Sequence, residues 1–392
     1  MKERIFGLQK NIFFLGLTSL FNDFSSEMVV SVFPAFFASV LRAGAESLGL
    51  VDGIAEAASN FFKIYSGALS DRIQSRKPLV VAGYTLSVVT RPFFVLVSSV
   101  GGALGLRFTD RIGKGLRDAP RDAIISLSVS KEELGRSFGY HRAMDTVGAI
   151  LGPLAAYLIL LRFPMHFNAV FITAFVVGIA SVVTLAFISD VAAVAGARKN
   201  LLTEFSGLSP QFRKFLFAMF ILSAGSLPIA VMLLKTESIG LVIADIPLFY
   251  MIYNISYAAL SMPAGKLSDR VGARSVIILG YAFLIAGYGM IAIADSVSAL
   301  AIGFFVMGLF PACTDGVVRA FASELTAENV RGGGMGWINA VSGFGALLAG
   351  IGGGYIWQTY GPSAAFGASS VVVIAGIIAL SAVSKKRQYQ TH

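Results

Sequence analysis

The sequence is poor in the residues that metal sites and disulfides require. Its 392 residues include one cysteine, Cys313, and three histidines, His141, His166 and His392. A single cysteine excludes a disulfide framework and a cysteine-rich metal centre, and no His-x-x-x-His or Glu-x-x-His pair is present. We therefore expect no metal site and no cofactor.

A phosphate-binding Gly-x-x-x-x-Gly-Lys-Ser/Thr loop is also missing. Its absence argues against ATP as the energy source, which leaves an ion or solute gradient. The sequence shows no pairing of a nucleophile with a base, so we do not expect an enzyme.

Charged residues are scarce as well. They make up 14% of the chain, whereas 56% is hydrophobic and the mean hydropathy is +0.75. Apolar windows of about 20 residues, long enough to cross a bilayer as a helix, recur throughout, and they lack the period-two alternation of membrane barrels. We therefore predict an all-α membrane protein with twelve transmembrane helices. The predicted spans are 11–41, 48–70, 78–98, 102–126, 137–161, 166–188, 211–235, 244–265, 275–294, 298–323, 333–357 and 362–384. The polar stretch 1–10 precedes no cleavage site and is expected to be retained.

The few basic residues gather in alternate loops. Those on one side include Lys2, Arg4, Lys10, Arg72, Arg76, Lys77, Lys131, Arg136, Arg198, Lys199, Arg213, Lys214, Arg270, Arg274, Arg331, Lys385, Lys386 and Arg387. The other side has little beyond Arg42, Arg162 and Lys235. The positive-inside rule then places both termini in the cytoplasm and the chain in the inner (plasma) membrane. The net charge of +9 suits anionic lipid headgroups and is no evidence for nucleic acid.

One loop phrase occurs twice. Gly67-Ala-Leu-Ser-Asp-Arg72 returns as Gly265-Lys-Leu-Ser-Asp-Arg270, and each copy is followed by a Gly-Tyr pair. A repeat of this period predicts two bundles of related structure. We expect an N-terminal six-helix bundle in 1–188, a cytoplasmic linker in 189–210 and a C-terminal six-helix bundle in 211–392.

The repeated Gly-x-Leu-x-Asp-Arg loop resembles the signature of the major facilitator superfamily. The resemblance covers the whole chain and implies two pseudo-symmetric six-helix bundles, alternating access and a functional monomer. It also implies a cytoplasmic gate, which we assign to Gly67, Asp71, Arg72, Gly265, Asp269 and Arg270. The alternative is that Arg72, Arg76 and Lys77 only fix topology. The first copy departs from the family pattern, with Gln74 and Ser75 where glycine is common.

The fourth predicted helix is unusual because it is charged. It carries Arg107, Asp110, Arg111, Lys114, Arg117, Asp118, Arg121 and Asp122. A lipid-facing charge at the midplane costs about 2.5 to 3.5 kcal/mol, so these residues must face protein or water. Steps of four residues join Asp110 to Lys114 and Lys114 to Asp118, which predicts ion pairs along the helix. Arg111-Ile-Gly-Lys-Gly115 resembles the Arg-x-x-x-Gly pattern of proton-coupled members. We assign Arg111, Lys114 and Asp118 to proton coupling; Arg121 is a gate candidate that pairs with Asp71.

The first helix supplies acids. Asp23 and Glu27 are four residues apart and share one helix face, with Asn22 beside them as a cavity residue. A carboxyl group buried without a cation favours its protonated form, so both are candidate proton carriers. The alternative is a static ion pair with Lys63 or Arg91.

The fifth helix combines a polar cluster with small residues. His141, Arg142 and Asp145 are spaced to meet on one face. The pattern of Gly148, Gly152 and Pro153 resembles one carried by antiporters of the superfamily, where it implies a hinge, although Ala155 and Ala156 replace the usual trailing glycines. Close helix approach at the two glycines is expected.

In the second half, the candidate cavity residues are mostly aromatic and uncharged. Tyr250, Tyr253, Asn254 and Tyr257 form one helix face, and further cavity candidates are Asp315, Trp337 and Asn339. Packing is the alternative role for the aromatic face.

Together these residues predict a cavity rich in cations. Lys63, Arg91, Arg107, Arg111, Lys114 and Arg142 favour an anionic or zwitterionic small molecule over an organic cation. We expect a proton-coupled secondary transporter, with export favoured by the fifth-helix pattern. Proton-coupled uptake of an organic anion, such as an iron-chelating siderophore, is the alternative favoured by the basic cavity. A non-transporting membrane sensor ranks last.

Overall fold

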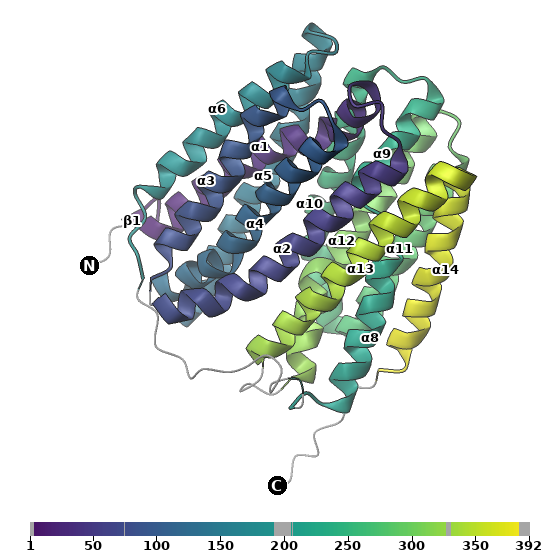
Figure 1. Cartoon of the computed structure of the whole chain (residues 1–392). Coiled ribbons are helices and arrows are strands. Elements are labelled where there is room, and N and C mark those ends of the chain that lie inside the picture. The colour runs from purple at the N-terminus through teal and green to yellow at the C-terminus, as the bar shows by residue number, and fades with distance from the viewer. Residues whose placement is uncertain (1–3, 74, 192–204, 206, 327–330, 384–392) are drawn as a thin grey trace.

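A computed structural model describes residues 4–73, 75–191, 205, 207–326 and 331–383. Its helices form two bundles that stand side by side (Figure 1). The first half contains α1 (Lys10–Ser39), α2 (Ala45–Ile73), α3 (Lys77–Phe93), α4 (Val100–Ser128), α5 (Leu134–Arg162) and α6 (Phe167–Leu185). The second half contains α8 (Pro210–Ala224), α9 (Ile229–Leu233), α10 (Ile246–Val271), α11 (Ala273–Ile293), α12 (Val297–Leu325), α13 (Arg331–Tyr360) and α14 (Pro362–Ser381). Short 3-10 turns are η1 (Phe94–Leu96), η2 (Lys131–Glu133), η3 (Leu234–Ile239) and η4 (Ile243–Asp245). The predicted all-α architecture is confirmed, and most of the linker predicted in 189–210 lies outside the described residues.

The seventh predicted span departs from a continuous helix. α8 ends at Ala224, and α9 begins only after Gly225-Ser226-Leu227-Pro228. Proline lacks a backbone donor and glycine is a poor helix former, so the segment between them breaks the ladder. Tyr288 of α11 satisfies the freed groups: its Oη accepts from Leu227 N at 2.7 Å and donates to Gly225 O at 3.1 Å.

Nine helical segments in the described part are long and apolar enough to cross a membrane by length and composition. α1, α2 and α4 are not among them. These three helices carry many of the polar and charged residues of the first half, which lowers their mean hydropathy.

A small hairpin precedes α1 and departs from the all-helical prediction. β1 (Arg4–Ile5) pairs antiparallel with β2 (Leu8–Gln9) through a turn at Phe6 and Gly7, both at positive φ. Positive φ at both central residues is the geometry of a type I′ turn. The guanidinium of Arg4 lies 2.7 Å from Glu133, which ties the hairpin to η2.

The repeated Gly-Tyr pairs have a packing role. A β-carbon on Gly83 would lie 2.6 Å from the carbonyl oxygen of Gly113, and one on Gly280 would lie 2.9 Å from Cβ of Cys313. Glycine therefore lets α3 approach α4, and α11 approach α12, at related places in the two halves.

The two halves meet chiefly along two helix pairs, α2 with α13 and α5 with α10, and α1 also contacts α10. Figure 1 shows α2 and α13 running alongside each other. We call the end that carries the two repeated loops the loop side, and the other end the opposite side. At the opposite side α2 and α13 touch through backbone: a β-carbon on Gly49 would collide with the carbonyl oxygen of Gly350, and Ala45 N donates to Gln358 Oε1 at 3.1 Å. We call Gly49, Gly53, Gly350 and Gly354 the glycine seam.

Candidate functional site

The charged residues of α4 lie against α2 and α3 inside the first half. Arg107 bonds Asp52 of α2 at 2.7 Å, and its guanidinium lies 4.9 Å from the ring centre of Phe33. The side chains of Arg107 and Asp52 are 4% and 11% exposed. This is a buried ion pair, which the sequence did not predict because it joins residues 55 positions apart.

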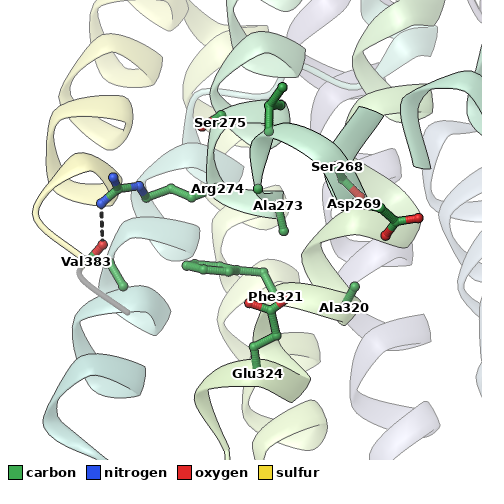
Figure 2. A pocket seen from close by; sticks show the side chains of 11 residues that line it. Ser268, Asp269, Ala273, Arg274, Ser275, Ala320, Phe321, Glu324 and Val383 are labelled. Carbon is green, nitrogen blue, oxygen red and sulfur yellow. Dashed lines mark hydrogen bonds between the residues drawn. The ribbon is translucent and has the colours of Figure 1, made fainter. Parts of the chain in front are cut away.

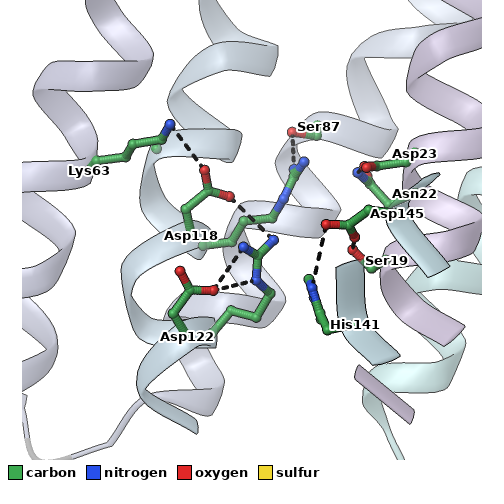
Figure 3. Close-up of polar contacts among 12 residues, drawn as sticks. Ser19, Asn22, Asp23, Lys63, Ser87, Asp118, Asp122, His141 and Asp145 are labelled. Atoms are coloured by element: carbon green, nitrogen blue, oxygen red, sulfur yellow. Dashed lines mark hydrogen bonds and ion pairs between the residues drawn. The ribbon is translucent and has the colours of Figure 1, made fainter. Parts of the chain in front are cut away.

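Nearer the loop side, Asp118 bridges two cations (Figure 3). Lys63 Nζ of α2 lies 3.3 Å from its carboxylate, and Arg121 lies 3.6 Å away. Arg121 also bonds Asp122 at 2.9 Å. The predicted pairs Asp110–Lys114 and Lys114–Asp118 do not form within 4 Å among the described residues, because α2 brings Lys63 closer to Asp118 than Lys114 reaches.

Arg91, Arg111, Lys114 and Arg117 have no carboxylate within 4 Å among the described residues. Arg91 is buried and bonds Ser25 Oγ and, at 3.0 Å, Asn22 Oδ1. Arg117 donates to Ser87 Oγ at 2.8 Å and lies over the ring of Tyr84. Arg111 and Lys114 are half-buried, and their charges interact chiefly with Glu56 among the carboxylates. Of the cations predicted to line the cavity, Arg91, Arg111 and Lys114 therefore lack a direct carboxylate partner, whereas Lys63, Arg107 and Arg142 have one.

The acids of α1 are not in ion pairs. Asp23 accepts from Asn22 Nδ2 at 3.0 Å, and Glu27 accepts from Tyr250 Oη of α10 at 2.6 Å. Neither has a Lys or Arg nitrogen within 4 Å among the described residues. The alternative of a static pair with Lys63 or Arg91 is wrong, since Lys63 binds Asp118 and Asn22 stands between Arg91 and Asp23.

The α5 cluster is built around Asp145. Its carboxylate accepts from Ser19 of α1 and lies 3.5 Å from His141 Nδ1 (Figure 3). Arg142 lies 3.9 Å from the same carboxylate. His141 is buried, and its Nε2 has no hydrogen-bond partner among the described residues. The predicted grouping of these three α5 residues is present.

Arg142 reaches the other half. It lies 3.8 Å from Asp315 of α12 and over the ring of Tyr257 at 4.9 Å, and Tyr257 Oη donates to Asp315 at 2.7 Å. The side chains of Arg142 and Asp315 are 53% and 60% exposed. These three residues form a polar contact between the halves that water reaches.

The predicted face of α10 points at the first half. Tyr250 bonds Glu27, Asn254 Nδ2 donates to Ala149 O at 3.1 Å, and Tyr250 and Tyr253 stack with ring centres 6.0 Å apart. Trp337 and Asn339 of α13 do not join this face. Trp337 packs on Phe205 at 4.8 Å, and Asn339 lines a groove beside α2.

The predicted hinge glycines lie in a helix contact within one half. A β-carbon on Gly148 would lie 2.5 Å from Leu20 O, and one on Gly152 would lie 2.6 Å from Phe24 O. The expected close helix approach is present, between α5 and α1, and Pro153 sits inside the same helix. A hinge role stays a prediction.

The gate residues are placed as follows. Gly67 faces Ala119, with 3.7 Å between its would-be β-carbon and that of the alanine, whereas Gly265 has no such neighbour within 4 Å in the described part of the chain. Arg270 is exposed, and Asp269 lines a pocket of about 460 Å³ with Arg274 and Glu324 (Figure 2). The side chains of Asp71 and Arg72 lie outside the described residues, as does any pairing of Asp71 with Arg121.

Sequence reasoning missed the acids of α2 and the glycine seam. Asp52 and Glu56 are four residues apart within a predicted span, and an ionisable residue at membrane depth is itself a signal. Gly49 with Gly53 and Gly350 with Gly354 form small-xxx-small patterns, which mark close helix contacts in membranes. Both signals were readable from the sequence.

The chain is similar in sequence and in fold to known membrane transporters. The profile described as Major Facilitator Superfamily matches residues 15–236 and 215–391. An uncharacterised MFS-type transporter of Methanocaldococcus jannaschii is 32% identical over 383 residues, covering 95% of both chains. Among solved structures, a POT family transporter in complex with 5-aminolevulinic acid aligns with a TM-score of 0.81 at 11% identity, covering 97% of this chain and 98% of that one. The nucleoside transporter NupG aligns with a TM-score of 0.78 at 14% identity, covering 96% of this chain and 100% of that one. This chain belongs to the major facilitator superfamily of membrane transporters.

Proposed function

We propose that this protein is a proton-coupled secondary transporter that moves a small organic solute across the membrane by alternating access. The observation that carries the proposal is the contact of Glu27 with Tyr250. Glu27 lies in the middle of α1 with no cation within 4 Å among the described residues, and its one hydrogen-bond partner there belongs to the other half. Protonation of this carboxyl group changes a bond between the halves, so it can bias their relative position.

The structure supports a state that is open at the loop side. At the opposite side the glycine seam brings α2 and α13 into backbone contact, and α1 is buried without a break from Met28 to Phe37. At the loop side Arg142 and Asp315 face each other across the halves and are about half exposed. Charged groups at membrane depth that are exposed must meet water rather than lipid. With the loop side in the cytoplasm, as the basic loops predict, this is a cytoplasm-open state.

The charges favour an anionic or zwitterionic solute. The half-buried Arg111 and Lys114 have no carboxylate within 4 Å among the described residues, and a bound anion would supply a counter-charge to them. The 5-aminolevulinic acid in the solved POT structure is an amino acid, which is this charge type. Protons are the second ligand, bound at Asp23 and Glu27, with Arg111, Lys114 and Asp118 as further coupling residues.

Export is the favoured direction, because Gly148, Gly152 and Pro153 resemble the antiporter pattern. Uptake of an organic anion by proton symport is the second candidate, and the absence of a direct carboxylate partner at Arg111 and Lys114 favours it. The two differ in whether solute and protons move in opposite directions or in the same one.

The test is solute flux in proteoliposomes with an imposed pH gradient. A panel of anionic, zwitterionic and cationic solutes is assayed for the wild type, Glu27→Gln, Arg111→Ala and the control Glu46→Gln, which changes an exposed carboxylate on α2. We expect gradient-driven flux of an anion or zwitterion in the wild type and control, and background flux in the other two. Gradient-driven flux that survives in Glu27→Gln would overturn the coupling role.

A further inference from the structure

The described part of the chain contains an apolar groove that the transport proposal does not use. It has a volume of about 410 Å³ and lies where α2, α4 and α13 meet. Apart from two asparagines its walls are apolar and carry no charge; they are Ile54, Ala57, Ala58, Asn60, Phe61, Phe62, Phe108, Asn339, Ala340, Gly343, Phe344 and Leu347. For scale, an apolar cavity of roughly 150 Å³ in another protein binds benzene.

The groove opens on the surface that faces the bilayer. Its residues lie in the interior of α2 and α13, away from the helix ends. Phe61 is 65% exposed and Phe344 is 66% exposed, and both are walls of the groove. Exposed apolar rings at this depth, with no charged residue among the walls, suit contact with hydrocarbon rather than with water. The groove is thus continuous with the lipid-facing surface.

The polar groups of the groove are partly satisfied from within the protein. Asn60 is buried, and its Nδ2 donates to Glu56 O at 3.0 Å and to Glu56 Oε1 at 3.3 Å. A polar or charged ligand would find few free partners here, whereas a hydrocarbon chain needs none. The shape of the groove, its position within the membrane span and its lack of charge therefore all favour a hydrocarbon chain.

We propose that the groove binds the acyl chain of a bilayer lipid. Each methylene group that leaves one apolar environment for another gains little from water exclusion, so affinity comes from packing against the walls. Both halves supply walls: α2 and α4 on one side, α13 on the other. A chain held there lies beside the contact of Gly343 with Asn60, where the halves approach closely.

The experiment uses the full-length protein in vesicles of phosphatidylcholine and phosphatidylglycerol. A phosphatidylcholine with a diazirine on one acyl chain is the probe, and cross-linked peptides are quantified by mass spectrometry. Ala340→Trp fills the groove, whereas Ile378→Trp adds the same ring at a lipid-exposed site on α14 and is the matched control.

We expect cross-links on 54–62 and 339–347 in the wild type. They should fall several-fold in Ala340→Trp, because the indole ring occupies the space in which the chain packs against the walls, and stay unchanged in Ile378→Trp. Ala340→Leu places a smaller side chain in the groove and should reduce the cross-links by an intermediate amount. It keeps the test valid if the tryptophan variant misfolds.

Equal cross-linking of groove peptides in all four proteins would overturn the proposal. So would competition by a polar solute of the transport panel, which would assign the groove to that solute. Cross-linking does not depend on flux, so a failed transport assay and a failed lipid site give different results.

Discussion

α4 and α12 occupy related places in the two halves and differ in chemistry. Each has 29 residues, and each begins after a serine that caps its first turn: Ser99 Oγ accepts from Gly102 N at 3.2 Å, and Ser296 Oγ accepts from Ala299 N at 3.4 Å. α4 nevertheless carries eight charged residues, whereas α12 carries Asp315, Arg319 and Glu324. Caps and close glycine contacts preserve the repeated fold, and the side chains between them are free to diverge.

The ion pairs of the two regions differ in the same way. Arg107–Asp52 is short and buried within the first half, while Arg142–Asp315 is longer, exposed and spans the halves. A buried ion pair favours one arrangement of its helices, because separating the partners leaves a buried charge without a counter-charge. An exposed ion pair contributes little to the free energy of folding, so its partners can separate at low cost. The first half therefore has the properties of a rigid frame, and the contact between the halves those of a reversible one.

The largest expected effect comes from breaking the buried pair. Asp52→Asn leaves Arg107 buried without its counter-charge and should lower the free energy of unfolding by about 3 to 5 kcal/mol. Denaturant unfolding in mild detergent measures it, with Glu46→Gln on the same helix as control. The double variant Asp52→Asn, Arg107→Met should recover part of the loss; an effect of Asp52→Asn as small as that of the control would contradict the frame.

A second test targets the glycine seam. A β-carbon at Gly350 would collide with Gly49 O, whereas one at Gly352, on the same helix, meets nothing within 4 Å among the described residues. Gly350→Leu should therefore disfavour the loop-side-open state by about 1 to 3 kcal/mol, the usual range for overpacking. Accessibility of a cysteine placed on the opposite side measures this, and Gly352→Leu should match the wild type. Similar labelling of both variants would show that the glycine seam does not hold the opposite side closed.

The exposed pair should give a smaller effect. Asp315→Asn removes the acceptor that Arg142 and Tyr257 share, and should change stability by at most about 1 kcal/mol. High salt should reduce this difference further, since exposed charges are screened. Thermal unfolding at two salt concentrations checks it. A salt-independent loss as large as that of Asp52→Asn would show that this pair also belongs to the frame.

The smallest effect concerns Asp190, which follows α6 outside the spans. Its carboxylate accepts from Ser75 Oγ and from the backbone N–H groups of Arg76 and Lys77, at 3.1 and 3.0 Å. Partial burial opposes the charged form, but these hydrogen bonds outweigh it and hold the pKa of Asp190 below its ordinary value of 3.8. A lowered pKa in the folded state means stability that is present above pH 3.8 and is lost as the pH falls through the folded value.

Asp190→Ala should thus cost about 0.5 to 1 kcal/mol at neutral pH, the size of a helix cap. The cost should shrink at a pH far enough below 3.8 to protonate Asp190 in the folded protein, because the wild type then loses the charge as well. Melting temperatures at both pH values test this, with Asp190→Asn as the variant that keeps an acceptor oxygen. A melting-temperature difference between the wild type and Asp190→Ala that grows toward low pH would contradict a lowered pKa of Asp190 in the folded protein.

The sequence predicted the fold well because membrane depth and the repeat leave strong marks. Continuous apolar windows located the helices, of which nine segments in the described part are apolar enough to cross a membrane, and the two Gly-x-Leu-Ser-Asp-Arg loops predicted the division into halves. The seventh span broke at Gly225 to Pro228, where a local signal was outweighed by the window average. The face of Tyr250, Asn254 and Tyr257 followed from helical spacing alone.

Partners on different helices were not predictable in the same way. Spacing tells which residues share a helix face, but not which helix lies opposite. Asp118 was expected to pair with Lys114, one turn away, and instead binds Lys63 of α2. Arg107 likewise takes Asp52 of α2, and Trp337 packs on Phe205 rather than on the tyrosine face.

The most direct test of the account measures the position of the halves as a function of pH. In a Cys313→Ser background, spin labels at Arg136 and Arg270 report on the loop side, and labels at Glu46 and Tyr360 report on the opposite side. Pulsed electron resonance distances are recorded in lipid nanodiscs at acidic, neutral and mildly alkaline pH for the wild type and Glu27→Gln. We predict that the two pairs shift in opposite directions with pH in the wild type and that Glu27→Gln shows one distribution at every pH. A variant that shifts as the wild type does would contradict Glu27 as the site that couples protons to the motion.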